Sequence, residues 1–118
     1  GLPTGREGYP LHARVRYFDP EGRRAGVPED VAALVTRLTA TETDLTLVNI
    51  SQVESRTVIV QGGGYGEHQI MSATANGRTL DVGASAYTVR LAPGAGVDLT
   101  LTMRRYANNP TLEFPWNR

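Results

Sequence analysis

The last strand-like segment of the chain has the clearest pattern, a strict alternation of apolar and polar residues over residues 97–104. One face carries the apolar side chains of Val97, Leu99, Leu101 and Met103. The other face carries the polar side chains of Asp98, Thr100, Thr102 and Arg104. A period of two residues is typical of a β-strand with one buried and one solvated face. Because weaker copies of this pattern precede it, the sequence predicts a protein built from antiparallel strands.

Further strand-like segments recur at intervals of about 8 to 12 residues, which is typical of a β-sandwich. Turn residues separate them, and Asn76-Gly77 is the strongest turn signal because both residues tolerate positive φ. We therefore expect a mainly β protein, an antiparallel immunoglobulin-like β-sandwich of about seven strands. The expected strands cover residues 11–17, 45–50, 56–61, 68–74, 79–82, 87–91 and 97–104.

Residues 28–40 break the strand rhythm and predict one short helix. Four apolar residues have the i, i+3, i+4, i+7 spacing of an amphipathic stripe, namely Val31, Leu34, Val35 and Leu38. Pro28 suits the first helical turn, and Glu29 and Asp30 complement the positive end of the helix dipole. The competing prediction is a strand over residues 34–39, since Val and Thr are abundant there.

The length and composition of the chain limit its class. A chain of 118 residues is expected to form one domain over residues 1–118. Its 12 basic and 12 acidic residues give a net charge of zero, so we expect no nucleic-acid partner. No apolar run approaches ~20 residues, so we expect no membrane span. The absence of cysteine excludes disulfides and thiolate chemistry but leaves the compartment open.

Every one of the 12 basic residues is arginine, and lysine is absent. Codon bias in a GC-rich bacterial genome is the favoured interpretation. The alternative is selection for bidentate, persistently charged contacts. We therefore expect a bacterial source.

The two ends of the chain depart from the strand pattern. Residues 1–10 contain three Gly and two Pro without periodicity, which is typical of a linker-like lead-in. Residues 106–118 form an apolar tail in which Leu112, Phe114 and Trp116 alternate with other residues. We expect the tail to pack as a flap on the domain or on a neighbour, in preference to binding a ligand.

A glycine-rich segment lies at residues 61–68, with glycine at positions Gly62, Gly63, Gly64 and Gly66. It lacks the Lys-Ser/Thr ending of a phosphate-binding loop. The favoured interpretation is a bulged loop between two strands, in which Tyr65 and His68 pack against a neighbouring surface. The alternative is an acid–base pair of Glu67 and His68, although neighbouring residues of an extended chain point to opposite sides. Glu67 is expected to be solvated, because it lies near turn residues.

Neither a metal site nor a cofactor site is predicted. A metal site would need His12, His68 and a carboxylate such as Glu67, and their spacing matches no ligand pattern. Six aromatic residues are candidates for stacking on sugar rings, namely Tyr9, Tyr17, Tyr65, Tyr87, Tyr106 and Trp116. Of these, Tyr17 and Tyr87 fall on apolar stripes and are expected in the core, whereas Tyr65 and Trp116 are the better exposed candidates.

Residues 45–105 resemble a β-sandwich that ends many multidomain bacterial carbohydrate-active enzymes. The resemblance depends on the hairpins, on the loop Gly62–Gly66, and on residues 88–97, where a strand turns through Pro93-Gly94 into the closing strand. It implies a C-terminal accessory domain that packs against a catalytic domain, and some such domains bind glycans. It assigns no catalytic residue, because no catalytic motif matches.

The leading functional hypothesis is a non-catalytic accessory domain of a larger bacterial protein, packed against a neighbouring domain of the same polypeptide or a partner chain. The candidate interaction surface comprises Gly62, Gly63, Gly64, Tyr65, Glu67, His68, Leu112, Phe114 and Trp116. One alternative is a carbohydrate-binding module that uses Tyr65 and Trp116. A second alternative is a small hydrolase that uses Glu67 and His68.

Overall fold

The computed structural model describes residues 14–117, and nine β-strands form within this range. The strands are β1 (Val15–Asp19), β2 (Arg24–Ala25), β3 (Val31–Leu38), β4 (Glu42–Asn49), β5 (Arg56–Gly62), β6 (Gln69–Ala75), β7 (Arg78–Ala84), β8 (Ala86–Leu91) and β9 (Gly96–Arg104). One 3-10 turn, η3 (Pro115–Asn117), follows near the end of the chain. The expectation of a mainly β protein is confirmed.

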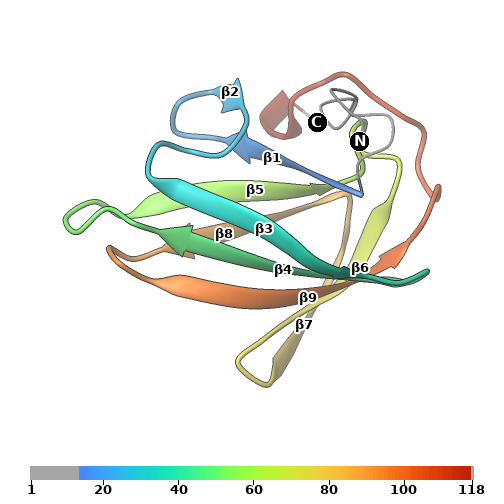
Figure 1. Cartoon of the computed structure of the whole chain (residues 1–118). Helices are drawn as coiled ribbons and strands as arrows, with labels where there is room; N and C mark the ends of the chain where they lie inside the picture. The colour runs from blue at the N-terminus through green and yellow to red at the C-terminus, as the bar shows by residue number, and fades with distance from the viewer. Residues whose placement is uncertain (1–13, 118) are drawn as a thin grey trace, which may run out of the picture.

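The strands form two antiparallel sheets that lie face to face (Figure 1). The four-stranded sheet has the order β2-β1-β5-β8, and the five-stranded sheet has the order β3-β4-β9-β6-β7. The core lies between them and takes side chains from both, including Val58, Val60, Leu47, Ile70 and Leu101. The sequence pattern thus predicts the antiparallel arrangement correctly but underestimates the number of strands.

The alternating segment at residues 97–104 forms β9, a central strand between β4 and β6. Leu99, Leu101 and Met103 are at most 4% exposed. On the opposite face, Asp98 accepts a 2.6 Å hydrogen bond from the Thr46 hydroxyl of β4. This strand has the buried and solvated faces that its sequence predicts.

The predicted helix at residues 28–40 is wrong, because β3 occupies most of this segment and pairs with β4. The helical stripe does not pack as a unit, since Leu34 is 64% exposed and Leu38 is 54% exposed. Instead, Val31, Ala33 and Val35 face the core with a period of two. β-Branched residues suit this pleated surface, and pairing with β4 satisfies the backbone of β3. The competing prediction of a strand is closer to the structure.

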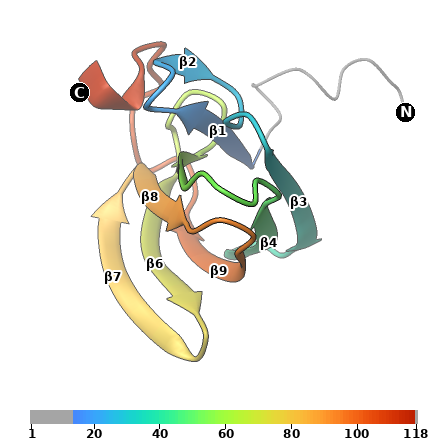
Figure 2. The ribbon, with the colours of Figure 1, turned by 90° about the vertical axis from the view of Figure 1, so that its left-hand side faces the viewer.

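The predicted hairpin at Asn76-Gly77 is confirmed, with φ angles of 53° and 76°. It joins β6 to β7, and β7 forms an outer edge of the molecule (Figure 2). At the other end of the chain, the expected strand at residues 11–17 appears as β1 from Val15 onward. The first residues of that strand and the lead-in at residues 1–10 lie outside the described range.

Asn49 links the two sheets at one end of the fold. Its side chain is fully buried, and its Nδ2 donates hydrogen bonds to the carbonyl oxygens of Glu54, Leu91 and Ala92. Its Oδ1 accepts a 3.0 Å bond from the Ser51 amide. Asn49 lies in an Asn-Ile-Ser sequence that matches a glycosylation acceptor, but these bonds occupy the amide in the folded protein.

The outer face of the four-stranded sheet carries a second, smaller apolar cluster. Phe18 and Ile59 are opposite each other on β1 and β5, and both are buried outside the main core. The rings of Phe114 and Trp116 stack on each other at 4.9 Å and meet Phe18 edge-on at 5.8 and 6.1 Å. This part of the tail therefore covers its own domain.

Candidate functional site

The glycine-rich segment connects β5 of one sheet to β6 of the other. Gly62, Gly63, Gly64 and Gly66 are all buried, and the φ angles of Gly63 and Gly66 are 85° and 71°. A Cβ atom at Gly62 would collide with the carbonyl of His68, and one at Gly63 would collide with the carboxyl of Glu67. The glycines therefore allow the chain to fold tightly on itself here.

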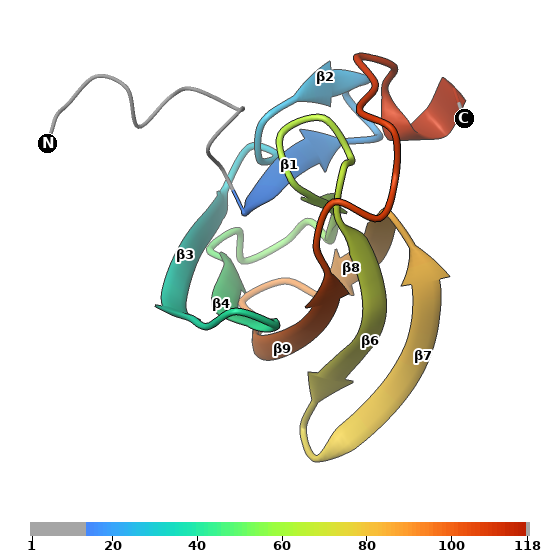
Figure 3. The ribbon, with the colours of Figure 1, turned by 90° about the vertical axis from the view of Figure 1, so that its right-hand side faces the viewer.

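The tail after β9 runs back along this loop (Figure 3). The amide of Asn108 donates to the carbonyl oxygen of Glu67 at 3.1 Å, and its side chain donates to that of Gly66 at 3.2 Å. The amide of Thr111 donates to the carbonyl oxygen of Tyr65 at 2.7 Å. These three hydrogen bonds join the tail to Tyr65, Gly66 and Glu67 of the loop.

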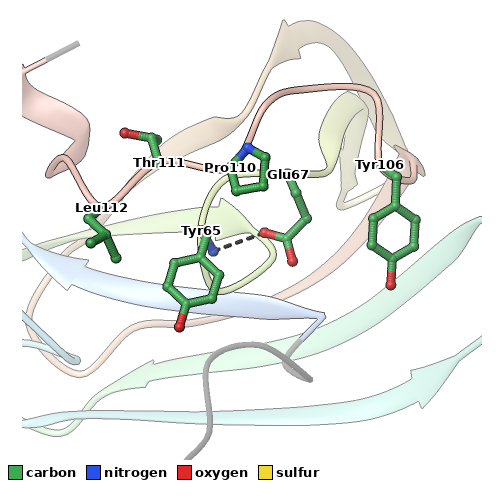
Figure 4. A pocket seen from close by; sticks show the side chains of 6 residues that line it. All are labelled: Tyr65, Glu67, Tyr106, Pro110, Thr111 and Leu112. Atoms are coloured by element: carbon green, nitrogen blue, oxygen red, sulfur yellow. Dashed lines mark hydrogen bonds between the residues drawn. The ribbon is translucent and has the colours of Figure 1, made fainter.

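A pocket of about 490 Å³ opens where the loop and the tail meet. It is lined by Tyr65, Glu67, Tyr106, Pro110, Thr111 and Leu112 (Figure 4). Leu112 is 82% exposed and Tyr106 is 69% exposed, whereas Glu67 is only 4% exposed. Two tyrosine rings, a proline and a leucine therefore surround a mostly buried carboxylate.

Glu67 is buried rather than solvated, which corrects the sequence-based expectation. Its Oε1 accepts a 2.9 Å hydrogen bond from the Tyr65 amide. In Figure 4 the carboxylate lies between the side chains of Tyr65 and Tyr106. The carboxylate fits against Gly63 because this residue has no side chain. The tail, which is hydrogen-bonded to the loop, packs over the loop as well. No local sequence pattern predicts that Glu67 is buried.

His68 is also buried, but it does not line the pocket. Its Nδ1 accepts a 3.0 Å hydrogen bond from the Tyr106 amide, and its ring meets the Tyr106 ring edge-on at 4.7 Å. Burial lowers the pKa of His68, and the charges of Arg105 and Arg14 lower it further, while Glu67 opposes them. Among residues 14–117, no hydrogen bond joins the side chains of Glu67 and His68. Although Glu67 and His68 are neighbours in the sequence, their side chains therefore have different partners.

The predicted interaction surface divides into separate parts. Tyr65, Glu67 and Leu112 share the pocket. Phe114 and Trp116 lie instead on the outer face of the four-stranded sheet, against Phe18. The three glycines are buried and shape the loop.

Sequence reasoning did not assign Pro110 and Thr111 to a site, and it ranked Tyr106 below Tyr65 and Trp116. The structure places all three of the undervalued residues in the pocket wall. The Asn-Asn-Pro turn after β9 is the signal that could have found them, because it sends the tail back towards the domain. Tyr17 and Tyr87 pack against the core, as their apolar stripes predict.

No group of three or more potential metal ligands occurs among the residues that the structure describes. Within the same residues, no helix is long and apolar enough to cross a membrane. Predictions involving His12 and Tyr9 fall outside the described range. No protein family, curated protein or solved structure matches the chain.

Proposed function

We propose that this chain is a non-catalytic accessory domain, an immunoglobulin-like β-sandwich that packs against a partner domain of a larger protein. The surface that would make the contact is the pocket between the glycine-rich loop and the tail. The exposure of Leu112 and Tyr106 beside an apolar pocket supports this proposal most directly. Contiguous apolar surface of this kind is typical of interaction sites.

The energetics favour a contact at this place. Full burial of one leucine side chain stabilises an association by roughly 1.5–3 kcal/mol, and tyrosine is enriched among residues that dominate binding. The hydrogen bonds of Asn108 and Thr111 fix the tail before any partner arrives. Less conformational entropy is then lost on binding.

The surface proposed here is smaller than the one expected from sequence. Phe114 and Trp116 already cover Phe18, so their rings are engaged within the domain. Leu112, in contrast, is 82% exposed. It therefore takes the central position in the proposed contact.

Site-specific photo-crosslinking in the source organism tests this proposal. A photoreactive amino acid at Leu112 should give a defined adduct, either within a longer polypeptide or with one partner chain. Mass spectrometry of the adduct then identifies the contacting segment. The same amino acid at Leu80, which is 56% exposed on β7, is the matched control and should give no such adduct.

The purified partner segment provides the decisive step. Leu112→Asp should abolish its binding, because a charge would have to be buried in an apolar contact. Leu80→Asp should leave it unchanged. Equal behaviour of the two variants, or the absence of any defined adduct at Leu112, would contradict the proposal.

A carbohydrate-binding role is the second candidate, because Glu67 lies between Tyr65 and Tyr106 (Figure 4). Aromatic faces suit the apolar faces of sugar rings, and a carboxylate oxygen can accept sugar hydroxyls. Trp116 cannot report on this pocket, since it stacks on Phe114 elsewhere. Amide NMR of the loop during titration with a glycan panel is the suitable measurement. No shift at residues 62–68 with any glycan would exclude this candidate.

A further inference from the structure

The arginines of this chain differ in how they are neutralised. Four of them form ion pairs with carboxylates at 2.8 to 3.6 Å, namely Arg24, Arg37, Arg56 and Arg90. Arg14 and Arg105 have no carboxylate within ion-pair distance among residues 14–117. Arg16, Arg23, Arg78 and Arg104 also lack such a partner within these residues. Arg14 and Arg105 are the two of interest here, because both belong to segments that border the pocket.

Contacts with the pocket residues place the two arginines. The guanidinium of Arg105 lies over the Tyr106 ring, 5.4 Å from its centroid. The carbonyl oxygen of Arg14 accepts a 2.7 Å hydrogen bond from Gly63, and its guanidinium donates to the carbonyl oxygen of Thr39 at 2.8 Å. Each arginine is therefore attached to an element of the pocket, one to the tail and one to the loop.

The electrostatic interactions of these groups show that they are close to one another. After burial, the charge of Arg105 is the main influence that lowers the pKa of Arg14. Both arginines also lower the pKa of His68. Glu67 is the carboxylate of the pocket lining, but it is mostly buried and accepts the Tyr65 amide. The exposed Arg105 and the half-buried Arg14 therefore lie at the rim beside Tyr106.

We propose that the pocket binds a partner segment in which an apolar side chain lies next to an acidic one. The apolar side chain would enter between Tyr65, Tyr106 and Leu112, and the carboxylate would bind Arg105 and Arg14 at the rim. This inference depends on the proposed docking function and specifies the chemistry of the partner. Charge complementarity of this kind mainly sets specificity and association rate.

A protein segment fits these features better than a nucleic acid. Nucleic-acid binding sites neutralise many phosphates, and this chain has a net charge of zero. The pocket offers apolar walls beside Arg14 and Arg105, neither of which has a carboxylate partner among residues 14–117, and this suits one apolar and one acidic side chain. A short single-stranded DNA of matched length therefore serves as the competing probe.

Selection from a library of displayed 12-residue peptides tests the inference. The wild-type chain is the bait, and Leu112→Asp is used to remove peptides that bind elsewhere. We expect the recovered peptides to share an aliphatic or aromatic residue adjacent to Asp or Glu. Calorimetry then measures the binding of a synthetic copy of the most enriched peptide.

Two arginine variants distinguish a direct contact between Arg105 and the peptide carboxylate from the effect of the protein's net charge. Arg105→Gln should lower the affinity for the enriched peptide about tenfold. Replacing the peptide's acidic residue by its amide should lower the affinity by the same factor. Arg78→Gln, which removes the same charge at the tip of the β6–β7 hairpin, should leave binding unchanged. Arg105→Gln should have no effect on the amide peptide, because the carboxylate is already absent.

The outcomes distinguish failure of this inference from failure of the docking proposal. Recovery of apolar peptides without an acidic residue, bound equally by wild type and Arg105→Gln, would overturn the inference alone. No enrichment over the Leu112→Asp selection would overturn both. Binding of the DNA probe with the same loss in Arg105→Gln would also overturn the inference, since phosphate would then be the recognised group.

Discussion

At the scale of single residues, the shape of the pocket depends most on Gly63. Its backbone has a φ of 85°, and a side chain there would collide with the Glu67 carboxyl. Gly77 has a similar φ of 76°, but a Cβ there would meet nothing within 4 Å. A comparison of substitutions at these two glycines therefore distinguishes the cost of backbone strain from the cost of steric collision.

We predict that Gly77→Ala lowers the free energy of unfolding by about 1 kcal/mol, the cost of a left-handed backbone for an L-residue. Gly63→Ala should lower it by at least about 2 kcal/mol, because the Glu67 carboxyl must also move. Urea unfolding measures both values. Equal losses for the two variants would show that the loop has room beside Gly63.

His68 is a second residue whose environment has a measurable consequence. Burial, with help from Arg105 and Arg14, lowers its pKa, so the folded protein favours the neutral ring that accepts the Tyr106 amide. The unfolded chain, with a pKa of about 6.5, therefore binds more protons in mildly acidic solution. Stability is then complete above about pH 6.5 and falls as the pH drops below this value.

The variant His68→Asn tests this pH dependence, because the asparagine oxygen can still accept the Tyr106 amide without titrating. We predict that wild type loses more stability than His68→Asn as the pH falls below about 6.5. Urea unfolding at a series of pH values gives the difference. Parallel curves for the two proteins would mean that His68 titrates identically in the folded and unfolded states.

At the scale of elements, the tail combines two roles that its sequence does not separate. Leu112 and Trp116 both belong to one alternating apolar run, yet Leu112 is 82% exposed and Trp116 packs against Phe18. The guanidinium of Arg23 also lies over the Trp116 ring at 5.0 Å. We therefore expect Trp116 to contribute to the stability of the domain and Leu112 to contribute to the proposed recognition.

We predict that Trp116→Ala lowers the free energy of unfolding by about 2 kcal/mol, since the side chain is partly buried. Leu112→Ala should change it by less than about 0.5 kcal/mol, as is usual for an exposed side chain. Chemical denaturation followed by circular dichroism measures both variants. A large loss for Leu112→Ala would show that this residue supports the fold and would weaken its assignment to a docking surface.

The same elements show what the sequence could and could not predict. The strand β9 and the Asn76-Gly77 turn follow from local rules, because alternation and positive φ are properties of the segment itself. The apolar residues of β3 fit both the helical and the strand period, and pairing with β4 decides in favour of the strand. The pocket depends on a hydrogen bond between Tyr65 and Thr111, which lie 46 residues apart in the sequence. No local pattern can specify such a contact.

At the scale of the whole molecule, the central and edge strands of the five-stranded sheet are held by different numbers of neighbours, and their stability should differ accordingly. β9 lies between β4 and β6, and its inward side chains are buried in the core. β7 pairs only with β6, and all of its residues except Val82 are exposed. Leu80, on β7, lies 56% exposed opposite the buried Ala73 of β6.

Native-state hydrogen exchange should resolve this difference. We predict that the amide of Leu101 in β9 exchanges only through global unfolding, because two neighbouring strands and the core must separate to release it. The hydrogen-bonded amides of β7 should exchange through local opening, at a free energy several kcal/mol lower and with little dependence on denaturant. Exchange followed by NMR at increasing denaturant concentrations measures both. Equal free energies for β7 and β9 would mean that the outer hairpin is as strongly coupled to the core as the central strand, and the exposed side chains of β7 would then need a partner surface of their own.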